Sequence, residues 1–98
     1  MVTTTAKQID FVPHAYFAFH TLSEKEQKKA MQLIELSGND NKILMLQGES
    51  YKLSNFERNI YALKLTDKLR IIVEILANEV KILDILNRDL YDVYFNKK

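Results

Sequence analysis

Cysteine is absent from this chain of 98 residues, and the chain has only two glycines and one proline. Without cysteine it can form no disulfide, no thiolate metal site and no cysteine nucleophile. Because small secreted domains often depend on disulfides, we expect a cytoplasmic location. The scarcity of glycine and proline leaves no low-complexity linker, so the length indicates a single domain over residues 1–98.

Long hydrophobic segments are also missing. No apolar run approaches the ~20 residues that a membrane-spanning helix needs, and the first ten residues contain no apolar stretch of signal-peptide length. We therefore expect no membrane partner. The formal net charge is only +1, so any phosphate-binding role must come from a local arrangement of cations.

Short amphipathic elements make up the N-terminal part of the chain. Ile9 and Phe11 alternate with polar neighbours, which predicts a strand over Gln8–Val12. Proline suits the first turn of a helix, and the apolar spacing behind it predicts a short helix over Pro13–Leu22. We expect the two histidines of this helix to be structural, since their spacing of six residues does not place them on one helical face.

A second helix follows directly. Ser23 and Glu26 have the spacing of a capping box, and the apolar period behind them predicts a helix over Glu24–Leu36. The polar, glycine-containing segment Gly38–Asn41 is expected to end it. Periodicity alone does not assign the short apolar run Ile43–Leu46. Gln47–Asn59 is polar, and we expect a loop there with a brief extended piece around Tyr51 and Leu53.

The C-terminal half has the pattern of a β-meander. Alternating apolar residues predict strands over Tyr61–Leu65, Leu69–Leu76 and Val80–Leu86, and the short connections make neighbouring strands antiparallel. Helical spacing after Arg88 predicts a short C-terminal helix. The expected fold is therefore α+β: an N-terminal strand and helix hairpin packed on an antiparallel meander.

Strand alternation assigns side chains to the two faces of this sheet. The apolar residues expected to face the helices are Tyr61, Leu63, Leu65, Leu69, Ile71, Val73, Ile75, Leu83 and Ile85. The same register puts Val80, Ile82 and Leu86 on the opposite face, with the charged side chains of Lys64, Arg70, Glu74, Asp84 and Arg88.

Two interpretations of the charged face remain open. It can be a solvated surface with cross-strand pairs, such as Arg70 with Asp84 or Arg88 with Glu74, each contributing roughly 0.2–1 kcal/mol. Alternatively, Lys64 and the two arginines flank a groove that holds a phosphate. The pattern alone does not decide between them.

The segment Tyr61–Ile75, followed by Val80–Arg88 and a tyrosine-containing tail, resembles the RelE/ParE superfamily of bacterial toxins. That family's pattern has a strand with arginine or lysine, a turn, a strand with an aromatic residue, arginine and two apolar residues, a hairpin, a strand ending in arginine, and a short tail with tyrosine. Leu69 stands here at the aromatic position. The matching positions are Lys64, Arg70, Arg88 and Tyr94. Leu46–Gly48 resembles the Leu-x-Gly that precedes the sheet, so the resemblance covers nearly the whole chain.

The resemblance implies a RelE-like endoribonuclease that cuts mRNA on the ribosome, by attack of a ribose 2′-OH on the adjacent phosphate and without a metal or cofactor. Such a step needs cations at the phosphate and groups that move two protons. The residues implied for catalysis are Arg70 and Arg88 on the phosphate, Tyr94 as a stacking or proton-exchanging group, and Glu74 as an alternative base. Those implied for RNA or phosphate binding are Lys64, Lys68 and Tyr91.

A toxin of this family also implies a cognate antitoxin, for which the apolar tail Leu90–Phe95 is a candidate surface. Two other functions stay open. ParE-like members inhibit DNA gyrase on the same scaffold, and a protein-interaction module without activity is compatible with the near-neutral charge and the acidic residues Glu74 and Asp84.

Overall fold

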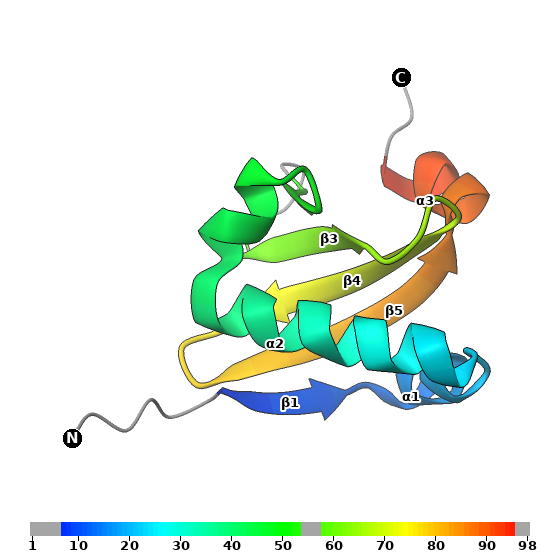
Figure 1. Cartoon of the computed structure of the whole chain (residues 1–98), viewed down its shortest axis with the longest axis horizontal. Helices are drawn as coiled ribbons and strands as arrows, with labels where there is room; N and C mark the ends of the chain where they lie inside the picture. The colour runs from blue at the N-terminus through cyan, green and yellow to red at the C-terminus, as the bar shows by residue number, and fades with distance from the viewer. Residues whose placement is uncertain (1–6, 54–57, 96–98) are drawn as a thin grey trace.

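The computed structural model describes residues 7–53 and 58–95, except for the side chains of 94 and 95. In chain order the elements are β1 (Gln8–Phe11), α1 (Pro13–His20), α2 (Glu24–Leu46), β2 (Ser50–Lys52), β3 (Ile60–Lys64), β4 (Leu69–Ile75), β5 (Glu79–Asn87) and α3 (Arg88–Phe95). α2 lies across one face of the sheet, and α3 sits at one end of it (Figure 1). The expected α+β arrangement is confirmed.

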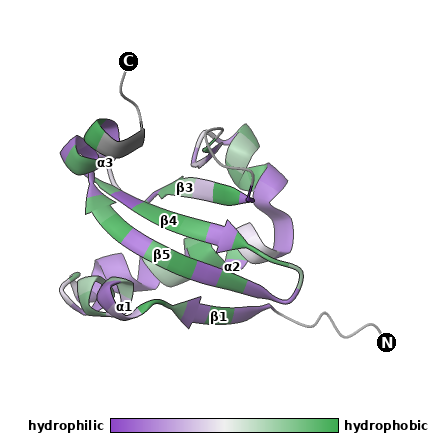
Figure 2. Cartoon of the chain, turned by 180° about the vertical axis from the view of Figure 1, so that it is seen from behind, coloured by the Kyte–Doolittle hydropathy of each residue, from purple (hydrophilic) through white to green (hydrophobic). Residues whose placement is uncertain are grey.

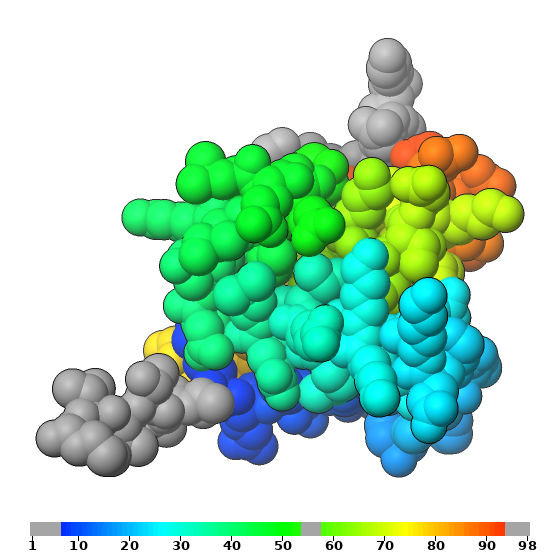
Figure 3. All heavy atoms as spheres, viewed as in Figure 1, coloured from blue at the N-terminus to red at the C-terminus, as the bar shows by residue number. Residues whose placement is uncertain are grey.

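The sheet has five strands in the order β1-β5-β4-β3-β2. β3, β4 and β5 form the expected antiparallel meander. β1 adds to β5 in parallel, which makes the sheet mixed. A parallel neighbour requires a long connection, and here the connection from β1 to β5 runs through α1, α2 and the strands β2, β3 and β4. α2 lies in front of the sheet in the space-filling view (Figure 3).

α2 is longer than its sequence indicates. Its capping box is present, since Glu26 N–H donates to Ser23 Oγ at 3.1 Å and Ser23 N–H donates to Glu26 Oε1 at 3.0 Å. The expected end at Gly38–Asn41 is confirmed in part: the helix is interrupted at Asp40, whose φ of −156° and ψ of 75° are non-helical, and a second helical segment then runs to Leu46. This segment follows the weak helix formers of Gly38–Asn41, and burial of its Leu44 in the core stabilises it. No helix in the described ranges is long and apolar enough to cross a bilayer.

The segment expected to be mainly a loop contains an edge strand. Gly48 turns the chain with φ 74°, a conformation that glycine adopts readily, and β2 then pairs with β3. The expected extended piece is therefore confirmed at Ser50–Lys52. Residues 54–57, which fall within the same expectation, lie outside the described part of the chain.

Apolar side chains pack on both faces of the sheet. The core beneath the helices includes Leu63, Leu65, Ile71, Val73, Val80 and Ile82. A smaller cluster on the other side, here called the far face, contains Leu53, Ile60, Ala62, Ile72 and Leu86, with Leu83 and Tyr91 packed against it. Figure 2 looks onto the far face, with α2 behind the sheet.

A β-bulge in β5 corrects the expected faces of that strand. Ile72 pairs with Asp84 but Val73 pairs with Ile82, so Leu83 is the extra residue. The bulge reverses the alternation: Val80 and Ile82 face the helices and Leu83 the far face, opposite to the prediction. Beyond the bulge, Ile85 packs on the helix-side core and Leu86 on the far-face cluster, as predicted.

Candidate functional site

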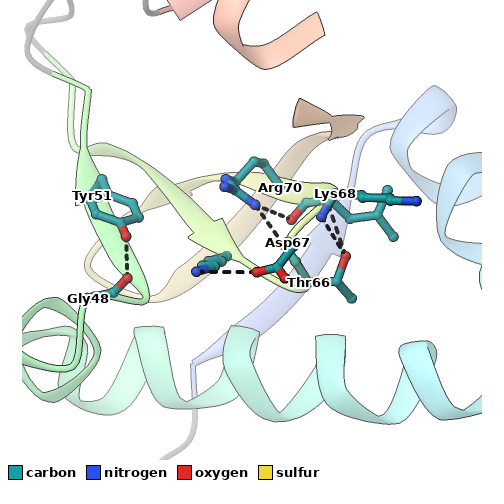
Figure 4. Close-up of polar contacts among 8 residues, drawn as sticks. Gly48, Tyr51, Thr66, Asp67, Lys68 and Arg70 are labelled. Carbon is teal, nitrogen blue, oxygen red and sulfur yellow. Dashed lines mark hydrogen bonds and ion pairs between the residues drawn. The ribbon is translucent and has the colours of Figure 1, made fainter. Parts of the chain in front are cut away.

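The β3–β4 turn and the start of α3 meet at one end of the sheet. Arg88 N–H donates to Lys68 C=O at 2.7 Å, which fixes the two segments to each other. Within the turn, the Thr66 hydroxyl accepts from the N–H groups of Lys68 and Leu69, both at 3.1 Å (Figure 4). Asn87 Oδ1 accepts from Leu90 N–H at 2.9 Å and caps α3. This end of the sheet is therefore held by local hydrogen bonds from both sides.

The register brings the predicted cations to this end. Lys64 lies directly opposite Arg70, and Arg70 lies opposite Leu86 on β5. Leu86 belongs to the far-face cluster, so Lys64 and Arg70 start from the far face as well. Arg88 follows two residues after Leu86, where β5 gives way to α3.

Arg70 is oriented by the turn that precedes it. Its Nη1 donates to Thr66 C=O at 2.7 Å and to Leu69 C=O at 3.1 Å (Figure 4). Among the described residues, no acceptor engages Nε or Nη2. A guanidinium presents its donors in a rigid planar fork suited to two oxygens of one anion. Arg70 is thus held in place while part of its donor set stays available.

Arg88 and Lys68 border a hollow of about 340 Å3, which Asn87 and Asp89 also line. Within the described ranges, neither cationic side chain makes an ion pair or hydrogen bond. Lys64 differs, because its Nζ lies 3.6 Å from Asp67 Oδ1. Exposed pairs of this kind contribute at most about 1 kcal/mol and exchange readily, so Lys64 can turn to an incoming phosphate at little cost.

Glu74 is set apart from these cations. Arg58 holds its carboxylate with two hydrogen bonds, from Nε at 2.8 Å and from Nη2 at 2.5 Å. The Glu74 side chain is only 8% exposed, and it lies four residues along β4 from Arg70, roughly 13 Å at strand spacing. The hydrogen bonds from Arg58 hold the pKa of Glu74 below its usual range. A carboxylate held in this way is a weak proton acceptor.

The cross-strand pairs considered for the charged face are absent from the described residues. Glu74 pairs with Arg58 and not with Arg88. Asp84 pairs with His14 Nε2 at 3.1 Å and not with Arg70. Because these acids are engaged elsewhere, neither neutralises the arginines near the β3–β4 turn.

The two tyrosines predicted for the site are both in α3. Tyr91 packs against the far-face cluster, and burial raises the pKa of its hydroxyl. It is therefore protonated at neutral pH and suited to donate a hydrogen bond. The Tyr94 side chain lies outside the described residues. Tyr51 on β2 was not predicted for the site; the alternation of Tyr51 and Leu53 was the available signal that both lie on the far face.

No protein-family model and no curated protein matches the sequence. Solved structures do resemble the fold. The YoeB–YefM complex from Staphylococcus aureus matches with a TM-score of 0.62 at 21% identity, over 82% of this chain and 94% of that one. The archaeal RelE–RelB complex from Pyrococcus horikoshii OT3 matches with a TM-score of 0.59 at 16% identity, over 85% of this chain and 96% of that one.

A YoeB dimer from Staphylococcus aureus matches similarly, with a TM-score of 0.61 at 21% identity, over 83% of this chain and 95% of that chain. The chain shares the fold of these YoeB and RelE structures. The fold that the sequence resemblance implied is thereby confirmed. At these identities the likeness establishes the fold alone.

Proposed function

We propose that this chain is the toxin of a type II toxin–antitoxin pair, and that it cleaves mRNA on the ribosome as a RelE-like endoribonuclease. The observation that carries the proposal is the set of cations around the β3–β4 turn. Arg70 is oriented by two carbonyls through Nη1, and no acceptor in the described part of the chain engages its Nε or Nη2. Arg88 and Lys68 border a hollow at the same end of the sheet. The toxin fold supports the same conclusion.

The proposed reaction is an attack of a ribose 2′-oxygen on the adjacent phosphorus. The new P–O2′ bond closes a cyclic phosphate as the P–O5′ bond breaks. The 2′-OH proton passes to a base, and a proton is delivered to the leaving 5′-oxygen. Negative charge builds on the non-bridging oxygens in the transition state. Arg70 and Arg88 are the residues proposed to stabilise it, since preorganised donors act most strongly where charge develops.

The remaining predicted residues take supporting roles. Lys64 and Lys68 are proposed to hold flanking phosphates, and Tyr91 to donate a hydrogen bond through its protonated hydroxyl. Tyr94 stays the proposed proton-exchanging group. Glu74 stays a prediction as the alternative base, but its pairing with Arg58 disfavours that role. A Glu74→Gln variant that cleaves normally would remove it from the site.

A cognate antitoxin is the proposed protein partner. The YoeB–YefM and RelE–RelB structures are complexes, and α3 of this chain exposes Leu90 and Val93. An apolar segment covering these side chains would also shield Arg88 at the start of the same helix. We expect such a partner to suppress cleavage by blocking access to the phosphate site.

The test is mRNA cleavage on translating ribosomes, mapped by primer extension. We expect Arg70→Ala and Arg88→Ala each to lose about 100-fold in rate, the scale for removing one donor that stabilises transition-state charge. Lys29→Ala is the matched control, because Lys29 is an exposed cation on α2. Undiminished cleavage in both arginine variants would overturn the proposal, as would arrest of DNA replication before protein synthesis, which would favour gyrase inhibition.

A further inference from the structure

Tyr51 stands on the far face, in the same layer as the proposed phosphate ligands. It pairs across the ladder with Ala62, which belongs to the far-face cluster. Directly paired residues of antiparallel strands share a face. The neighbouring β2 residues Ser50 and Lys52 point the other way; Ser50 Oγ contacts Asn41 on α2 at 2.8 Å.

The Tyr51 ring is both exposed and fixed. The residue is 44% exposed, so part of it is accessible to a ligand. Its hydroxyl donates to the Gly48 carbonyl, so the ring is anchored to the turn before β2 (Figure 4). An exposed side chain with a fixed orientation is prepared for a flat ligand, because little rotamer freedom remains to be lost on binding.

The spacing between Tyr51 and Arg70 suits one nucleotide. Arg70 is two strands from Tyr51 and two residues along the ladder, which places their Cα atoms roughly 12 Å apart on the far face. Both side chains are long, while Ala62 on the intervening strand is short. Tyr91 lies near both: its pKa is raised by burial, lowered by the charge of Arg70, and raised by the charges of Asp92 and of ionised Tyr51.

We propose that Tyr51 is the stacking surface for the base of the nucleotide whose phosphate Arg70 holds. This inference rests on the proposed function and names the RNA contact on which it depends. A phenol ring stacks on any nucleobase, so the contact positions the substrate without selecting its sequence. Tyr51 is therefore a substrate-binding residue, separate from the groups that move protons.

A direct test uses the absence of tryptophan from the chain. Tyr51→Trp makes the only indole, and its fluorescence reports stacking. A six-nucleotide RNA with 2′-O-methyl sugars, which cannot be cleaved by 2′-OH attack, should quench this signal. An abasic oligomer with the same phosphates is the control and should leave it unchanged. Equal responses to both oligomers, or none to either, would overturn the stacking role.

RNA binding and mRNA cleavage by Tyr51 variants test the stacking role separately from the proposed function. Tyr51→Ala should weaken RNA binding by about tenfold, within the range for losing one stacked base, while Tyr51→Phe should stay within about twofold of the wild type. Tyr16→Ala is the control, since Tyr16 is 50% exposed on α1.

Normal binding and cleavage by Tyr51→Ala would refute stacking and leave the proposed function standing. Quenching that depends on the base, in a protein that cleaves no mRNA, would refute the proposed function and leave the stacking role of Tyr51 standing. Far-UV circular dichroism of each variant checks its fold.

Discussion

The close contact between α2 and β5 at Gly38 gives a quantitative test of the fold that supports the site. A Cβ atom built on Gly38 would lie 2.8 Å from Val80 Cγ2, well inside van der Waals contact. Val80 is 1% exposed and β-branched, so its χ1 is restricted and it has little room to move away. We predict that Gly38→Ala destabilises the protein, although alanine is the better helix former.

The magnitude follows from two opposing effects. Overpacking a rigid core costs typically 1–3 kcal/mol, while replacing glycine by alanine within a helix gains about 1 kcal/mol. The expected net loss for Gly38→Ala is therefore about 1 kcal/mol. Val80→Ala alone removes two buried carbons and leaves a cavity, for an expected loss of about 2–3 kcal/mol. In that background the clash is gone, and Gly38→Ala should stabilise by up to about 1 kcal/mol.

The assay is urea unfolding of all four proteins in the double-mutant cycle, followed by far-UV circular dichroism. The decisive observable is the sign change of the Gly38→Ala effect between the two backgrounds. A stabilising Gly38→Ala in the wild-type background would refute the close approach of α2 to β5. Additive effects would do so as well, since they would mean that the two positions do not touch.

Three further predictions concern the helix cap, the buried ion pair and the far-face tyrosine. Ser23→Ala should cost about 1 kcal/mol of unfolding free energy in the same urea assay, because it removes the capping acceptor of α2; an unchanged midpoint would contradict the capping box. The pKa of Glu74 is lowered in the folded state, so its contribution to stability is present above the unfolded value of about 4.3 and lost as pH falls through the folded pKa. Stability of the wild type should thus fall more steeply with acid than that of Glu74→Gln, and parallel curves would exclude the pairing with Arg58. In an ultraviolet titration, Tyr91→Phe should remove a tyrosine that ionises above the usual pKa of about 10; loss of an ordinary tyrosine instead would contradict its burial.

The sequence predicted the meander because alternation in β3 and β4 leaves one consistent register. It did not predict the bulge in β5. Leu83 is apolar, like the residues on both sides of it, so either face accepts it and no local signal marks the extra residue. The bulge nevertheless decides the faces, since Val80 and Ile82 join the helix-side core while Leu86 stays on the far face with Arg70.

The extension of α2 shows the limit of local signals more plainly. A glycine, two asparagines and an aspartate in four residues normally end a helix, and here they interrupt α2 at the non-helical Asp40. What the sequence did not indicate is the second helical segment up to Leu46, in which Leu44 is buried in the core. Local propensity cannot report a contact with a strand that comes later in the chain.

The candidate site divides in the same way. Alternation predicted that Lys64 and Arg70 share a face. The partners of the acidic residues were not predictable from the sequence. Arg58, which pairs with Glu74, lies just before β3, and His14, which pairs with Asp84, lies in α1. Sequence spacing also gave no sign of the hydrogen bond from Arg88 N–H to Lys68 C=O, which fixes α3 to the turn.

The most direct test of the account is whether Arg70 and Arg88 bind the same phosphate. The chain has three arginines, so their guanidinium signals can be resolved by 15N nuclear magnetic resonance during titration with a 2′-deoxy dinucleotide that cannot be cleaved. We expect the signals of Arg70 and Arg88 to shift together with a single dissociation constant, while the signal of Arg58, held by Glu74, does not move. A response from only one of the two, or different dissociation constants for them, would contradict it.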